Sequence, residues 1–270
     1  MKIQAALLSL GMVSAAFCVD EYQPIEKSKT EIDVGVTYIA QTGTYDHDSK
    51  KVDLPSGVSP ALTGIPLQVK YGIMTGLDAE LAWTYAMFNK DAGDMAGFQQ
   101  PDLAVKYAFE GTGFAAYLDV VLPFVTGDFD VTPSGADLGI APGIVYGKNF
   151  GQIQAVGLVS YQYNLENGDK VKNGDLLTVY LKPGYSVSDA LAAYVGVKYQ
   201  MEGEAAFDGT SVTDTDGNLL TLLPGVTFTQ NKMLSYEVNV PITVMGKNAP
   251  NAFLNPPSWG VWASVYVTLP

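Results

Sequence analysis

The residues of this chain that could do chemistry are acids and lysines placed at alternate positions along apolar stretches. In residues 64–83, for example, Lys70 and Glu80 lie on the face opposite Ile65 and Leu67. An alternation with a period of two predicts β-strands with two unlike faces. Acids and lysines that share such a face suit either ion pairing or a water-filled path for a solute, because charged groups need a partner or water.

The residue types give poor support to an enzyme. Outer-membrane hydrolases need a histidine general base beside a serine nucleophile. The only histidine, His47, lies in the acidic segment TYDHDSKK, away from the strand serines, and the only cysteine, Cys18, lies near the N-terminus. The sequence has neither a Cys/His metal cluster nor a Gly-rich phosphate loop. We therefore expect no enzyme activity, cofactor or metal site, and an outer-membrane hydrolase is the least favoured alternative.

Composition narrows the choice further. The chain has 270 residues, a net charge of -13, and 15 basic residues that are all lysine. Such a charge repels phosphate, so we expect no nucleic-acid partner. With 47% hydrophobic and 16% charged residues, the chain can form one large all-β domain.

The first 18 residues, MKIQAALLSLGMVSAAFC, predict a signal peptide (1–18). Lys2 precedes an apolar stretch that is too short to span a bilayer, and Ala16 and Cys18 suit the positions before a cleavage site. A lipoprotein acylated at Cys18 is the rival reading, which the bulky Phe17 disfavours. Residues 19–30 are polar and lack periodicity. We interpret them as a flexible periplasmic N-terminal segment, with a piece tucked into the barrel mouth as the alternative.

Twelve alternating runs follow and predict an all-β fold, a 12-stranded antiparallel up-and-down transmembrane β-barrel over residues 31–270. Each run is about as long as the ~9–11 residues that a tilted strand needs to cross a bilayer. Very short connections alternate with long ones rich in Asp, Gly, Asn and Pro, which is typical of outer-membrane barrels. The runs lie near 31–43, 63–74, 77–89, 101–110, 113–125, 136–147, 152–164, 175–187, 190–203, 218–229, 233–245 and 258–269.

Pro-Gly pairs recur at a spacing of 41 residues, at Pro142, Pro183 and Pro224. This spacing equals one pair of strands with its turn and loop, so the barrel resembles a series of repeated hairpins. Because proline cannot donate a hydrogen bond to the strand ladder, we expect a bulge or an interrupted pairing at each Pro-Gly.

The apolar faces predict a surface in contact with lipid. They carry aliphatic residues at the centre and aromatic residues near the strand ends, as expected of membrane-interface girdles. The girdle is expected at Tyr71, Phe109, Phe114, Tyr146, Tyr185 and Phe228 on the short-turn side, and at Tyr38, Tyr85, Phe124, Tyr161, Tyr199 and Trp259 on the long-loop side. We expect a monomer in the cell outer membrane, with membrane lipid, lipopolysaccharide and the barrel-assembly machinery as partners.

The opposite faces predict a polar lumen. The expected solute pathway comprises Lys70, Glu80, Asp102, Lys106, Asp119, Lys182, Lys198, Glu202 and Glu237. Adding Glu31, Asp33, Asp78, Glu110 and Asp137 gives ten acids against four lysines on this face. Such an excess raises the local concentration of cations.

This pattern predicts an outer-membrane channel for the uptake of small neutral or cationic solutes, a class that extends to hydrophobic or aromatic compounds. One alternative is that the charges are neutralised structural pairs in a plugged barrel. Another is a non-conducting structural or surface-interaction barrel, whose acidic outer loops would meet divalent cations on lipopolysaccharide or another protein.

Three stretches carry a resemblance to a known family: VKYGIMTGLDAELAW, GFQQPDLAVKYAFE and GFAAYLDVVLPFVTGD. With Tyr71-Gly72, Asp102 and Lys106-Tyr107 they resemble the outer-membrane transporter family named for the meta-pathway of phenol degradation. The resemblance spans about Glu31 to Leu269 and implies a transport function in the outer membrane. The chain has LPFVTG where the family has LPTG, and it ends in VYVTLP without a terminal aromatic residue.

Overall fold

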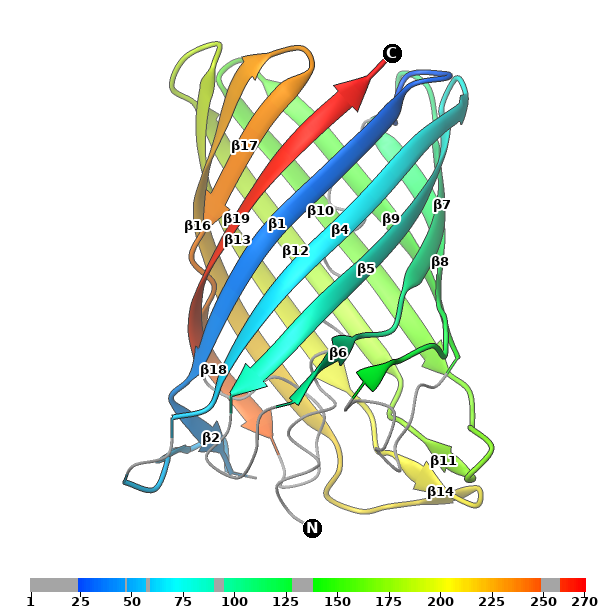
Figure 1. Ribbon diagram of the computed structural model, residues 1–270, viewed down its shortest axis with the longest axis vertical. Coiled ribbons are helices and arrows are strands. Elements are labelled where there is room, and N and C mark those ends of the chain that lie inside the picture. The colour runs from blue at the N-terminus through cyan, green and yellow to red at the C-terminus, as the bar shows by residue number, and fades with distance from the viewer. Residues whose placement is uncertain (1–23, 47, 57–58, 90–94, 128–137, 249–257) are drawn as a thin grey trace.

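The alternating runs form long tilted strands that close into a barrel (Figure 1). This computed structural model describes residues 24–46, 48–56, 59–89, 95–127, 138–248 and 258–270. The first strand pairs antiparallel with the last, from Thr30 opposite Leu269 to Gln41 opposite Ser258, and this pairing closes the sheet. The prediction of a 12-stranded antiparallel up-and-down barrel is confirmed.

The barrel strands keep their neighbours in chain order. They are β1 (Thr30–Gln41), β4 (Ala61–Met74), β5 (Leu77–Asn89), β7 (Asp102–Ala108), β8 (Phe114–Val121), β9 (Gly139–Phe150), β10 (Ile153–Asn164), β12 (Leu176–Ser186), β13 (Leu191–Glu202), β16 (Gly217–Asn231), β17 (Leu234–Asn239), β18 (Ile242–Asn248) and β19 (Ser258–Leu269). The eleventh crossing, expected as one run, is divided into β17 and β18 at Pro241, which has no N–H to give to the ladder.

Six short strands lie within the long connections, and they were not predicted from the sequence. They are β2 (Gly43–Tyr45), β3 (Lys51–Asp53), β6 (Met95–Phe98), β11 (Val171–Lys172), β14 (Ala206–Phe207) and β15 (Thr210–Ser211). In Figure 1 the long connections gather at one end of the barrel, and the C-terminus lies at the other end with the short turns.

The predicted signal peptide lies outside the described residues, as do residues 19–23 of the predicted N-terminal segment and His47. No helix in the described part of the chain is both long and apolar enough to cross a membrane.

The expectation of interrupted pairing at the Pro-Gly pairs is confirmed. Each proline is paired with one neighbouring strand, but the ladder to the other neighbour skips it. Beside Pro183, for instance, the β12–β13 pairing passes from Leu181 directly to Gly184 without a shift of register. The missing N–H of proline explains the gap, and the unchanged register explains why the barrel continues past it.

The two strand faces are clearly different in exposure. Leu67 on β4 is 45% exposed, whereas its neighbour Gln68 is 6% exposed. Most other large aliphatic residues on the outer face are also exposed, including Leu103, Leu118 and Leu181. An apolar exterior around a polar interior is the arrangement that a lipid environment stabilises.

A charge on this exterior should weaken folding into a bilayer. Leu118 lies in the middle of β8 and is exposed on the outer face, so Leu118→Lys should cost about 2–4 kcal/mol, the penalty for lysine at the bilayer midplane. Equilibrium unfolding in lipid vesicles measures this cost. Glu110→Lys, in an exposed turn, is the control and should change the unfolding free energy little.

Candidate functional site

The inner face of the barrel carries a dense set of charged side chains. Asp78, Asp102, Asp119 and Glu202 are each only 1% exposed. Lys70, Glu80, Lys106, Lys198 and Glu237 of the predicted solute pathway are buried as well, and Lys182 is half-buried. The residues are distributed around the wall in distinct groups.

Two members of the predicted lumen set are not among the residues described on the inner wall. Glu110 was expected in the lumen but is exposed in the turn after β7, because that strand already ends at Ala108. Asp137 lies outside the described residues. The described inner wall therefore keeps eight of the ten acids, together with the four lysines.

The first group of interior charges is held in ion pairs on β1, β4, β5 and β7. Lys70 Nζ lies 3.2 Å from Glu31 Oε1, and Lys106 Nζ lies 3.6 Å from Asp78 Oδ2. Beside them, the Gln68 amide donates a hydrogen bond to Glu80. Both lysines are almost completely buried, so each needs a partner to offset the loss of water. This part of the wall is a packed polar network.

Residues 24–29, the described part of the predicted N-terminal segment, lie against this network at the short-turn mouth. The backbone N–H of Ile25 donates to Asp78 Oδ2 at 3.1 Å, and Ile25 itself is buried. Gly72 on β4 accepts from the Ser28 amide (2.7 Å) and donates to the Lys29 carbonyl (3.0 Å). The segment therefore adds to the inner wall at this mouth.

The exposed side of the segment carries an ion pair of its own. Lys29 Nζ lies 2.6 Å from Glu26 Oε2, and this hydrogen bond lowers the pKa of Glu26 below its ordinary value.

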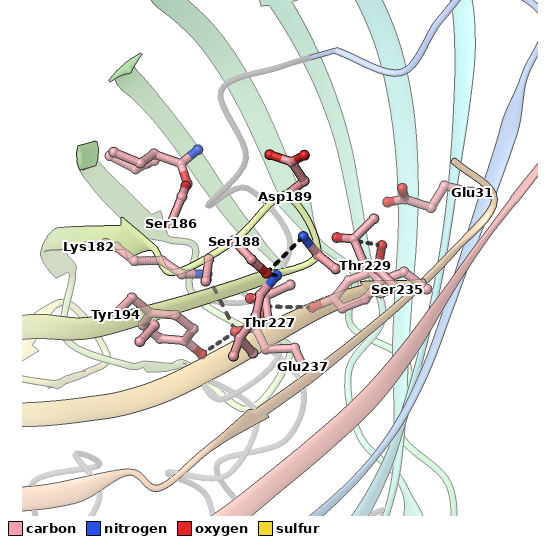
Figure 2. Close-up of a pocket in the computed structure, with 18 residues that line it drawn as sticks. Glu31, Lys182, Ser186, Ser188, Asp189, Tyr194, Thr227, Thr229, Ser235 and Glu237 are labelled. Carbon is pink, nitrogen blue, oxygen red and sulfur yellow. Dashed lines mark hydrogen bonds and ion pairs between the residues drawn. The ribbon is translucent and has the colours of Figure 1, made fainter. Parts of the chain in front are cut away.

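The second group surrounds a hollow of about 390 Å³ at the short-turn end of the lumen (Figure 2). We call it the mouth hollow. Its polar lining includes Lys182, Ser186, Tyr194, Thr227, Ser235 and Glu237. Hydroxyl groups that both donate and accept, together with one lysine and the three acids Glu31, Asp189 and Glu237, suit contact with a small polar solute.

Glu237 is the centre of the polar contacts in the mouth hollow. Its carboxylate accepts hydrogen bonds from Lys182 at 3.4 Å, from Tyr266 at 3.4 Å and, more closely, from Tyr194. The Lys182 ammonium also lies over the Tyr194 ring, 4.3 Å from its centroid. A cation over a ring face adds to the attraction of the carboxylate, so Lys182 is held from two directions.

A glycine makes this arrangement possible. Lys182 is on β12, Tyr194 on β13 and Glu237 on β17, with β16 between the last two. Gly225 on β16 is opposite Tyr194 in the register. A Cβ at Gly225 would overlap the end of the Tyr194 ring, so only glycine lets the ring extend across β16 to Glu237.

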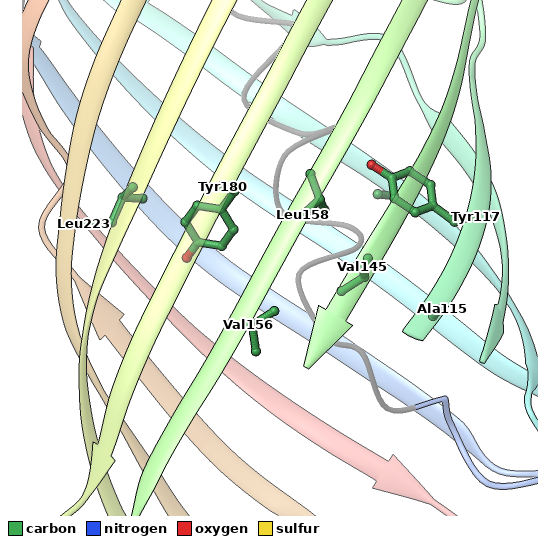
Figure 3. Packing of buried hydrophobic residues seen from close by; sticks show 8 residues of the cluster. Ala115, Tyr117, Val145, Val156, Leu158, Tyr180 and Leu223 are labelled. Carbon is green, nitrogen blue, oxygen red and sulfur yellow. The ribbon is translucent and has the colours of Figure 1, made fainter. Parts of the chain in front are cut away.

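Interior tyrosines were not among the predicted site residues. Tyr117, Tyr180 and Tyr194 are each 8% exposed on the inner face. Each leans over a glycine of the next strand: Gly143, Gly196 and Gly225 respectively. Figure 3 shows Tyr117 and Tyr180 with Leu158, Val156 and Leu223, so an apolar cluster lies on the polar wall.

The Pro-Gly repeat was the available signal for two of these tyrosines. Gly143 and Gly225 directly follow Pro142 and Pro224, and both receive a ring. The proline interrupts the ladder on one side, and the glycine after it leaves the inner face open to a neighbouring side chain.

A third group of predicted residues does not join the mouth hollow. Asp119 and Lys198 line a separate, smaller hollow nearer the long connections. Glu202 is buried near the long-loop end of β13. The predicted pathway residues are thus divided among a packed network, two hollows and the long-loop end.

The residues expected in the aromatic girdle lie outward on the strands or next to them. Tyr38, Tyr71, Phe109, Phe114, Phe124, Tyr161, Tyr185, Phe228 and Trp259 are exposed, and Tyr85, Tyr146 and Tyr199 are half-buried. Several pack on each other, for example Phe114 on Tyr146 with centroids 4.6 Å apart. Contact with membrane lipid stays a prediction for these residues.

No known protein family and no curated protein matches the chain in sequence. Its fold is similar to the crystal structure of an outer membrane channel from Pseudomonas putida F1, with a TM-score of 0.76, 14% identity, and coverage of 92% of this chain and 98% of that one. It is also similar to the NanC porin (TM-score 0.52, 10% identity, 88% and 100% covered). A third similar structure is the translocator domain of the autotransporter NalP from Neisseria meningitidis (0.52, 9%, 97% and 96%). The chain has the fold of an outer-membrane β-barrel.

Proposed function

We propose that this barrel is an outer-membrane channel for small polar solutes that are neutral or cationic. The observation that carries the proposal is the mouth hollow, whose hydroxyl and charged groups lie inside a closed barrel with an apolar exterior. A hollow of about 390 Å³ is large enough for a small solute. Two of the similar barrels are described as a channel and a porin, which supports the same class of function.

The charge of the inner wall supports the cation preference. The described part of the wall carries eight acids and four lysines, an excess of four acids. Because like charges in a confined, low-dielectric lumen attract counter-ions, cations should be enriched there and anions depleted.

The proposal extends to the transport class, the assembly partners and the oligomeric state. The resemblance to the transporter family of phenol degradation is consistent with transport. Insertion by the barrel-assembly machinery, contact with lipopolysaccharide and a monomeric state are expected for a barrel whose outer face is apolar all around.

Charge changes in the mouth hollow should shift ion selectivity in opposite directions. Glu237→Gln removes the acid that holds Lys182, so the lumen should become less selective for cations. Lys182→Met removes the base and should make it more selective. Reversal potentials of single channels in a planar bilayer under a salt gradient measure both shifts, and steady wild-type conductance tests the channel itself.

Glu110→Gln is the matched control, because it removes one acid from an exposed turn rather than from the lumen. It should leave the reversal potential unchanged. Shifts of the same sign in Glu237→Gln and Lys182→Met, or selectivity of the wild type for anions, would contradict the proposal.

One observation favours a second candidate, the non-conducting barrel. Residues 24–29 occupy part of the short-turn mouth, and the adjacent lysines, Lys70 and Lys106, are in buried ion pairs. A folded barrel that carries no current in any salt would support this structural role over the channel.

A further inference from the structure

The smaller hollow lies on the same inner wall as the mouth hollow, but nearer to the long connections. Its volume is about 20 Å³, and it is lined by residues of β8, β9, β10, β12 and β13. The polar ones include Asp119, Ser160, Gln162, Thr178, Lys198 and Gln200. A polar cavity of this size has room for one water-sized group, because about 10–15 Å³ already suffices for a water molecule.

Asp119 contributes a carboxylate oxygen to this hollow that lacks a hydrogen-bond donor. The residue is 1% exposed, and its Oδ1 atom has no hydrogen-bond partner. A buried carboxylate oxygen without a donor is costly, and donors that carry a positive charge satisfy it best. The group that occupies the hollow is therefore expected to be a hydrogen-bond donor.

The neighbouring amide group of Gln162 also offers an acceptor. Gln162 lines the hollow, but its Nε2 atom donates to Asn164 Oδ1 at 2.7 Å. Besides the second N–H of Nε2, the Gln162 side chain has the Oε1 acceptor. An occupant with several N–H groups can donate to Asp119 and to Gln162 at once.

The charge of the described wall as a whole favours a cationic donor over a neutral one, although the lining of this hollow itself carries one acid, Asp119, and one lysine, Lys198. Three of the four interior lysines, Lys70, Lys106 and Lys182, are in ion pairs with acids of the wall. The fourth, Lys198, lines this hollow and has contacts of its own. The excess of four acids over lysines on the described wall therefore remains to attract a cation.

We propose that this hollow, the Asp119 subsite, binds a primary ammonium group, either the ammonium ion or the end of an amine-bearing solute. The subsite gives the lumen a preference for cations that carry N–H donors over cations of equal charge without them. This inference rests on the proposed function only for the route by which a solute reaches the subsite.

Binding can be tested without current flow. Thermal unfolding of the folded barrel in detergent is compared in equal concentrations of ammonium chloride, potassium chloride and tetramethylammonium chloride. Tetramethylammonium has no N–H donor and is too large for the hollow. The wild type should unfold at a higher temperature in ammonium than in the other two salts, because a ligand that binds only the folded state stabilises it.

Two variants make the test specific. Asp119→Asn removes the charge and should lose the ammonium-dependent shift of the unfolding temperature. Asp119→Glu keeps the charge, but its longer side chain fills the hollow, so the shift should be lost there too. Glu110→Gln, in the exposed turn, should keep the shift.

Several outcomes would overturn the inference. Equal unfolding temperatures of the wild type in all three salts, or an equal shift in Asp119→Asn, would show that ammonium does not bind at Asp119. Stabilisation by methanol that also depends on Asp119 would assign the hollow to a neutral hydroxyl or to water instead. Variants that unfold much earlier than the wild type in every salt, with no ammonium shift in the wild type, would give Asp119 a structural role.

A second measurement separates this inference from the channel itself. Reversal potentials with ammonium on one side of a bilayer and tetramethylammonium on the other should show a preference for ammonium that falls severalfold in Asp119→Asn. A conducting barrel without that Asp119-dependent preference contradicts the subsite and leaves the channel in place. An ammonium shift in a barrel that does not conduct supports the subsite and contradicts the channel.

Discussion

Replacing Gly72 with alanine is expected to raise the conductance of the barrel severalfold. A Cβ at this position would lie 2.7 Å from the carbonyl carbon of Glu26 and closer still to its oxygen. Because these are backbone atoms, residues 24–29 would have to leave the inner wall of the mouth. The hydrogen bonds of Gly72 with Ser28 and Lys29 would be lost with them. Single-channel current in a planar bilayer measures the change.

Gly168→Ala is the matched control for this experiment. No atom lies within 4 Å of the position that its Cβ would take, and Gly168 lies in a long connection. It should conduct like the wild type. If Gly72→Ala folds and its conductance is unchanged, residues 24–29 do not limit the mouth, and the mouth hollow or a narrower part of the lumen sets the current.

Replacing Gly225 with alanine should remodel the mouth hollow without removing any charge. The new methyl group would overlap the end of the Tyr194 ring and lie 2.8 Å from Asn239 Cβ. The ring must then move away from Glu237, and Lys182 loses the ring on which it rests. We expect a changed conductance together with a shift in ion selectivity, because the Lys182–Glu237 ion pair becomes mobile once Tyr194 no longer contacts it.

The control for this variant lies in the same hollow. At Gly184 a Cβ would meet Ala193 O and Tyr194 Cβ at 3.5 Å, which is ordinary contact. Gly184→Ala should therefore leave current and selectivity close to those of the wild type. Equal effects of the two substitutions would mean that the volume of the hollow matters and the position of Tyr194 does not. Current and reversal potential of both variants are recorded under the same salt gradient.

The strands and their faces were predictable because a period of two is local information. The run expected at 63–74 is observed as Ala61–Met74, and the run expected at 258–269 is observed as Ser258–Leu269. The break at Pro241 was missed because the alternation continues on both sides of it. The six short strands of the long connections are too short to show a period at all.

The grouping of the interior charges was not predictable in the same way. Alternation tells which face a side chain takes, but not which distant strand it meets. Lys182 and Glu237 are 55 residues apart, with β13 and β16 between their strands in the sheet, and Tyr194 reaches Glu237 across Gly225 on β16. The hydrogen bond from Ile25 to Asp78 spans 53 residues and brings a segment without periodicity onto the wall.

The uneven wall of this barrel has a consequence for how the protein can change over time. On the side of Lys70 and Lys106, a substitution breaks a buried ion pair and leaves the partner as an unpaired buried charge. The loss of folding stability therefore limits which substitutions can accumulate there. The mouth hollow on the other side has open volume next to its polar groups, so a lining side chain outside the contacts of Glu237 can vary in size or charge at lower cost to folding. New solute preferences can therefore arise on one side of the lumen while the other side preserves the shape of the barrel.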